Sequence, residues 1–86
     1  MEKEIKKEKI DKRKQLIKLL GRANYNFLTS TYYIKSGDNG KIIILSGVEL
    51  YFPAIVLMKQ LGYDFIFARK KLNSYLIEAI FKKDEA

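Results

Sequence analysis

The sequence predicts an α/β protein of the α+β type: an N-terminal basic helix, then a β-β-α-β-α two-layer sandwich with a small mixed sheet. Three observations carry this prediction. The chain has 86 residues, of which 48% are hydrophobic, enough for one modest core. Its first twenty residues contain neither Gly nor Pro. After them, short β-branched segments and segments with helical spacing are separated by glycines.

The N-terminal segment is strongly basic. Residues 1–22 hold nine Lys and Arg against four Asp and Glu, and so carry five of the seven net positive charges. Pairs of opposite charge at i,i+4 and the absence of helix breakers predict one helix from about residue 3 to 20, ended by Gly21. We therefore divide the chain into a basic N-terminal helix or arm, 1–22, and a single compact domain, 23–86.

A β-hairpin is expected next. Residues 25–34 are mostly aromatic or β-branched, which favours a strand, and the turn formers of 36–40 include an Asn-Gly pair. Residues 41–45 are largely apolar and predict a second strand, in the middle of the sheet and covered on both faces.

A strand–helix–strand unit and a last helix complete the prediction. A helix beginning near 48–50 and ending at Leu61 precedes Gly62. Residues 64–68 are expected to form a third strand, parallel to the second. The apolar spacing of residues 72–81 predicts a closing helix.

The composition excludes much familiar chemistry. The chain has no Cys and no His, which removes thiolate catalysis, sulfur ligands and the commonest general base. The few acidic residues form no pattern typical of metal binding or acid–base work. We expect no enzyme activity, no catalytic residue, no metal and no cofactor.

The longest apolar run, residues 50–58, is too short to span a bilayer, and the charged N-terminus does not resemble a secretory signal. We expect no membrane contact and an intracellular location, in the cytoplasm or with the nucleoid or nucleus.

Two clusters of cations are candidates for phosphate contact. The first is the basic helix, for which a merely solvated surface is the alternative. The second, Arg69-Lys70-Lys71, is expected where a strand passes into a helix, so that free backbone N–H groups could assist in holding a phosphate. The candidate nucleic-acid-binding residues are Lys6, Lys7, Lys9, Lys12, Arg13, Lys14, Arg22, Arg69, Lys70 and Lys71.

Some aromatic residues could stack on unpaired bases, although core packing is the expected role of most. Phe27, Phe65, Phe67 and Phe81 are expected in the core. Tyr32 and Tyr33 are the possible stacking residues, and because neighbours on a strand face opposite sides, one of the two should be exposed.

Residues 41–83 resemble the core of the Alba family of small basic DNA- and RNA-binding proteins. The resemblance lies in the strand 42–45, a helix ending Leu61-Gly62, the strand 65–67, the basic turn 69–71 and a helix over 72–83. The lysines that the family places between its first strand and helix are missing from residues 46–49, and no hairpin follows the last helix. A looser likeness to ribosomal kink-turn-binding proteins lies in residues 19–21 and 69–73, without their Gly-Asn-Glu motif. Both likenesses imply a nucleic-acid partner.

These observations predict a non-enzymatic nucleic-acid-binding module. RNA is the expected partner rather than DNA, within a ribonucleoprotein assembly that could include other proteins. The alternative is a small protein–protein interaction subunit or inhibitor that binds an acidic partner. The sequence leaves the oligomeric state open.

Overall fold

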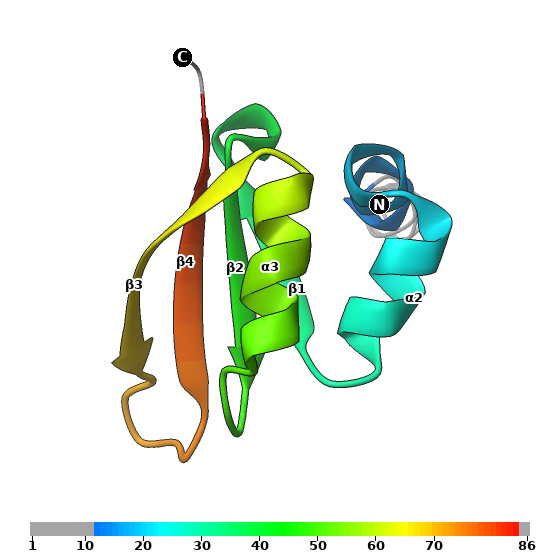
Figure 1. Ribbon diagram of the computed structural model, residues 1–86. Helices are drawn as coiled ribbons and strands as arrows, with labels where there is room; N and C mark the ends of the chain where they lie inside the picture. The colour runs from blue at the N-terminus through cyan, green and yellow to red at the C-terminus, as the bar shows by residue number, and fades with distance from the viewer. Residues whose placement is uncertain (1–11, 85–86) are drawn as a thin grey trace, which may run out of the picture.

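The computed structural model describes residues 12–84 (Figure 1). Residues 12–20 are helical, as predicted, while the rest of the predicted helix lies outside the described residues. Two further α-helices and four strands follow. In chain order these elements are α2 (Arg22–Thr29), β1 (Tyr33–Gly37), a 3-10 turn (Asp38–Gly40), β2 (Ile42–Gly47), α3 (Phe52–Gln60), β3 (Tyr63–Lys70) and β4 (Ile77–Lys83).

The four strands form one sheet in the order β1-β2-β4-β3, and every neighbouring pair is antiparallel. The strands β2 and β3 run in the same direction, as the strand–helix–strand prediction requires, but β4 lies between them. The predicted mixed sheet is therefore wrong: the sheet is antiparallel throughout. The broader prediction of an α+β fold is confirmed.

The predicted last helix is also wrong, because residues 77–83 form β4. Ala79 and Phe81 are buried against the helices, while Ile80 is half-buried on the other face. A central strand that carries apolar side chains on both faces can show the same spacing as a short amphipathic helix. The resemblance to the Alba family included a helix over residues 72–83, a segment whose larger part is the strand β4.

The predicted strand over residues 25–34 is replaced largely by α2. Gly21, with φ 89°, separates this helix from residues 12–20, and the Asn24 side chain donates a 2.8 Å hydrogen bond to the Leu20 carbonyl. Leu28 is fully buried on the inner side of α2. Its burial outweighs the strand preference of the aromatic and β-branched residues around it.

The hairpin and α3 follow the sequence prediction more closely. The β1–β2 turn passes through Asp38, Asn39 and Gly40, which all have positive φ. At α3, proline occupies the first turn, and the chain leaves the helix through Gly62, whose φ is 92°. The turn at residues 38–40 and the helix end at Gly62 therefore agree with the turn-forming residues in the sequence.

The core lies between the sheet and the helices. Figure 1 shows α2 and α3 on the same side of the sheet. Leu16 and Leu20 of the N-terminal helix join this core, so that helix packs onto the domain. The other core residues are Leu28, Tyr32, Ile43, Leu45, Ala54, Met58, Tyr63, Ala79 and Phe81.

Candidate nucleic-acid interface

The strand register sorts side chains onto the two faces of the sheet, because directly paired residues point to the same side. On the side of the helices, Leu45 pairs with Ala79, and Ile43 pairs with Phe81. All four are buried. The alternate residues therefore occupy the opposite face, which no helix among residues 12–84 covers (Figure 1).

We call this opposite side the open face. It carries three rows of side chains that cross all four strands. Read from β1 through β2 and β4 to β3, the rows are Tyr33-Ser46-Glu78-Arg69, Lys35-Ile44-Ile80-Phe67 and Gly37-Ile42-Lys82-Asp64.

Aromatic rings lie toward both edges of the open face. Tyr33, on β1, is 73% exposed, and Phe67, on β3, is 45% exposed. Between them, Ile44 and Ile80 are half-buried and form an apolar middle. An exposed ring beside apolar side chains on a sheet is a surface on which an unpaired base can stack.

Cations accompany these rings. Lys35 and Lys82 are exposed on the open face. Arg69 donates a 3.2 Å hydrogen bond from Nε to Glu78, which leaves the arginine side chain 59% exposed and orients it along the first row. At the third row, the Asp64 carboxylate accepts a hydrogen bond from Lys59 of α3, and this hydrogen bond raises the pKa of the Lys59 ammonium. The open face therefore carries three cations, Lys35, Lys82 and Arg69, and two carboxylates, Glu78 and Asp64, each of which has an ion-pair partner.

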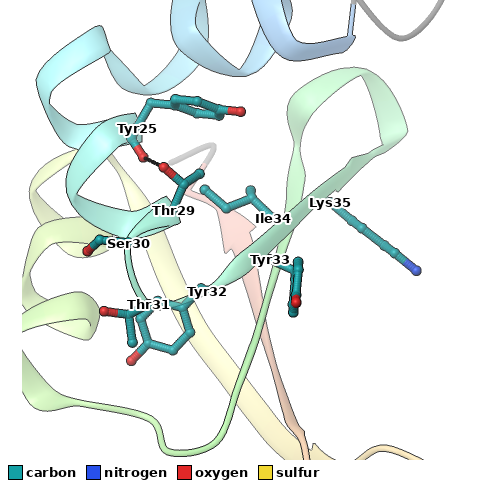
Figure 2. Close-up of a pocket in the computed structure, with 8 residues that line it drawn as sticks. All are labelled: Tyr25, Thr29, Ser30, Thr31, Tyr32, Tyr33, Ile34 and Lys35. Atoms are coloured by element: carbon teal, nitrogen blue, oxygen red, sulfur yellow. Dashed lines mark hydrogen bonds between the residues drawn. The ribbon is translucent and has the colours of Figure 1, made fainter.

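Figure 2 shows the β1 edge of this surface. The side chains of Tyr33 and Lys35 point to one side of β1, and Ile34 points to the other, toward α2. A groove of about 590 Å³ lies between α2 and β1. There the Thr29 hydroxyl donates a 2.8 Å hydrogen bond to the carbonyl of Tyr25 (Figure 2).

Tyr32 and Tyr33 differ as expected for neighbours at the start of a strand. Tyr32 is 6% exposed, and its hydroxyl accepts a 2.9 Å hydrogen bond from the backbone N–H of Tyr51. The rings of Tyr32 and Tyr51 also meet edge to face. Only Tyr33 of the two presents its ring to solvent, so base stacking at this position would fall to Tyr33.

The cluster Arg69-Lys70-Lys71 lies at the end of β3 and in the loop that leads to β4. The loop is closed by a 2.8 Å hydrogen bond from the Lys71 N–H to the Leu76 carbonyl. No helix begins here, so the expected contribution of a helix N-terminus is wrong. All three cations are nevertheless exposed, and Lys70 and Lys71 directly follow Arg69, which lies on the open face.

The predicted cations of the basic helix divide into two groups. Lys12, Arg13 and Lys14 are exposed on this helix, and Arg22 is exposed at the start of α2. Of these, Lys12 lines a second groove of about 390 Å³ together with Lys35 of β1. The remaining three, Lys6, Lys7 and Lys9, lie outside the described residues.

Sequence reasoning missed two residues of the open face, Lys35 and Phe67. Phe67 was expected in the core, as were Phe27 and Phe65, yet these three side chains are 45%, 55% and 40% exposed respectively. Phe81 is buried as expected. The missing signal was the strand character of β4, since its register with β2 and β3 assigns each side chain to a face.

Among residues 12–84, no cluster of three or more acidic side chains could hold a metal ion. No helix in the same part of the chain combines the length and apolar character that a bilayer crossing requires.

No family model matches the sequence, and no match was found among curated proteins or solved structures.

Proposed function

We propose that the protein is a non-enzymatic nucleic-acid-binding module that holds single-stranded RNA on the open face of its sheet, as a component of a ribonucleoprotein assembly. One observation carries the proposal: the open face combines exposed aromatic rings, Tyr33 and Phe67, with an apolar middle and with the cations Lys35, Lys82 and Arg69. On the opposite face, the helices bury Ile43, Leu45, Ala79 and Phe81.

The parts of the open face would have separate roles. Tyr33 and Phe67 would stack on bases, a contact that every base can make. Lys35, Lys82 and Arg69 would neutralise phosphates and release counterions. The strands β1 and β3 are separated by three strand spacings, about 14 Å, so one extended strand can reach both edges.

The geometry favours unpaired nucleic acid. Stacking on Tyr33 or Phe67 requires a base whose flat face is free, and in a duplex these faces are covered by neighbouring bases. RNA is the expected form because proteins usually recognise RNA through unpaired loops and ends. The cations at 69–71 and on the N-terminal helix would extend phosphate contact beyond the sheet.

Fluorescence anisotropy with a labelled single-stranded RNA of mixed sequence tests the proposal, with duplex DNA of equal length as the comparison. We expect tighter binding of the single strand and a marked loss of affinity between about 50 and about 200 mM salt. Undetectable binding at low salt, or affinity that is unchanged by salt, would contradict the proposal.

A specific observation supports the alternative, a protein-interaction subunit or inhibitor, through an apolar contact with its protein partner. A largely apolar groove of about 550 Å³ lies between α2 and α3, where Phe27 is 55% and Phe52 is 73% exposed. If this groove holds the main ligand, Phe27→Ala will weaken the binding of that ligand and Tyr33→Ala will not. The open-face proposal predicts the opposite result for RNA: Tyr33→Ala will weaken RNA binding, and Phe27→Ala will not.

A further inference from the structure

The two edges of the sheet differ in how they are protected against pairing. The edge strand β1 has five residues, with Lys35 at its centre and Gly37 at its end. Short strands and central lysines are common protections of an edge. The other edge strand, β3, has eight residues and no proline. At its centre Phe65, Ile66 and Phe67 are 40%, 51% and 45% exposed, so its apolar middle is open to a partner strand.

The two ends of β3 carry opposite charges, and each of these charges also has a partner within the chain, Lys59 for Asp64 and Glu78 for Arg69. Asp64 lies near its beginning, and Arg69 and Lys70 lie at its end. When such a strand pairs with a copy of itself in the antiparallel direction, the acidic end of each copy meets the basic end of the other. Opposite charges placed directly across two strands stabilise the pair, and like charges destabilise it.

We infer that β3 pairs antiparallel with β3 of a second copy of this chain, with Asp64 opposite Arg69 of the second copy. This inference does not rest on the proposed RNA binding. It names one interface, a two-fold contact between identical strands, and one register.

The faces of the strands agree with this register. Asp64 and Arg69 both lie on the open face, because they pair with Lys82 and Glu78 of β4. On the side of the helices, the same register places Phe65 opposite Ala68 of the second copy, and both of these residues pair with helix-side residues of β4. A two-fold axis perpendicular to the sheet leaves like faces on the same side.

The irregularity of β3 fits the same arrangement. The pairing with β4 shifts between Phe65 and Phe67, so that Ile66 is the extra residue of a bulge. A bulge on one strand usually interrupts pairing with a regular strand. In the proposed pair both strands carry the bulge, and the two bulges lie opposite each other across the two-fold axis. Ile66 of each copy then lies opposite Phe67 of the other.

The pairing would also close on itself. It would produce an eight-stranded sheet whose outer edges are the two protected β1 strands, so further copies could not add in the same way. The two open faces would become continuous, with both Phe67 side chains near the centre. The assembly would be a dimer.

Disulfide trapping tests the register, because the chain contains no cysteine of its own. The variants Asp64→Cys and Arg69→Cys are mixed in equal amounts and oxidised. Directly opposite residues have Cα atoms about 5 Å apart, within the range of a disulfide. In each variant alone, the two cysteines of a pair are separated by five residues along the strands, about 17 Å. We expect covalent dimer in the mixture and little in either variant alone.

Sedimentation velocity tests the interface in the unmodified protein, without nucleic acid. We expect a mass approaching twice the monomer mass of 10.1 kDa as concentration rises. Ile66→Lys should shift this equilibrium to monomer. Val48→Lys is the matched control, since Val48 is exposed to a similar degree, 59%, in the loop between β2 and α3.

Three results would overturn the inference. One is a wild-type protein that stays monomeric up to about 1 mM. Another is a dimer that Val48→Lys and Ile66→Lys weaken equally. The third is a cysteine mixture that cross-links no better than its separate components. Circular dichroism shows whether Ile66→Lys folds, and the trapping result decides the question if it does not.

Discussion

The hydroxyl of Tyr63, at the start of β3, donates a 2.5 Å hydrogen bond to the carbonyl of Gly40 in the β1–β2 turn. Tyr63 is 1% exposed, and the Lys83 ammonium lies 4.9 Å from the centroid of its ring. The contact joins the turn at one end of the hairpin to the strand at the far edge of the sheet. It therefore holds β1 and β2 in place relative to β3 and β4.

Replacement of this tyrosine should have an effect that depends on pH. Burial raises the pKa of Tyr63 above its ordinary value. The folded protein thus retains the phenolic proton more strongly than the unfolded chain does. The stabilisation by the neutral tyrosine is complete below the ordinary tyrosine pKa, about 10, and is lost as pH rises through the higher folded value.

Tyr63→Phe should therefore lower the free energy of unfolding by about 1–3 kcal/mol at neutral pH, because the Gly40 carbonyl loses its buried donor. The difference from wild type should narrow above about pH 10. Urea denaturation of both proteins between pH 7 and pH 11 measures this difference. Tyr75→Phe, at a 74% exposed position, is the control and should have little effect. A constant difference across the pH range would show that the Tyr63 hydroxyl does not titrate as expected.

A second prediction concerns Gly47, at the end of β2. A Cβ at this position would lie 2.7 Å from the Tyr32 ring and 3.2 Å from the Thr31 carbonyl. The Tyr32 ring cannot move aside easily, because its hydroxyl is bonded to the backbone of Tyr51. Gly47→Ala should lower the free energy of unfolding by about 1–3 kcal/mol.

The matched control for this change is Gly37→Ala. A Cβ at Gly37 would point into open space, so the substitution should be neutral or slightly stabilising. Thermal melting of the two variants measures the contrast. Equal melting temperatures would contradict the described packing of Tyr32 against β2.

The third prediction compares two aromatic residues of equal exposure. Tyr33 on the open face and Phe52 on α3 are both 73% exposed. If RNA stacks on the open face, Tyr33→Ala should cost about 1–3 kcal/mol of binding free energy, and Phe52→Ala should cost almost none. Anisotropy titrations with single-stranded RNA give both values. A larger loss in Phe52→Ala would move the binding site to the helices.

The fourth prediction concerns the β3–β4 loop. Joint replacement of Arg69, Lys70 and Lys71 with Ala should weaken RNA binding and reduce the slope of log affinity against log salt by up to about 2. The melting temperature should fall modestly, because Lys70 and Lys71 are exposed but the loss of Arg69 leaves Glu78, whose side chain is only 12% exposed, without its ion-pair partner. A large loss of stability with an unchanged salt slope would make the loop a structural feature only.

Much of the fold could be predicted because certain residues act locally. Gly21 and Gly62 end helices through positive φ, and Asn39 and Gly40 form the hairpin turn. These conformations are unfavourable for most other residues, so the sequence identifies them. The helical residues 12–20 and the helix α3 were predicted for the same reason, because a glycine lies just beyond the C-terminal end of each helix.

The remainder depends on contacts between distant segments. Residues 77–81 have helical spacing, but β2 and β3 offer them backbone partners on both sides, and tertiary pairing decides the structure. Residues 25–34 favour a strand by composition, but the burial of Leu28 selects a helix up to Thr29. The candidate site was found only in part for the same reason. The cations at 69–71 are visible as a cluster in the sequence, whereas the row of Lys35, Ile44, Ile80 and Phe67 exists only through the register.

The most direct measurement of the central claim is a titration of the isotope-labelled protein with single-stranded RNA, followed by amide NMR spectra. The account predicts the largest shifts at the open-face positions of the four strands, including Tyr33, Lys35 and Phe67, and at residues 69–71. It predicts small shifts along α3. Shifts concentrated in α2 and α3, or none at saturating RNA, would contradict it.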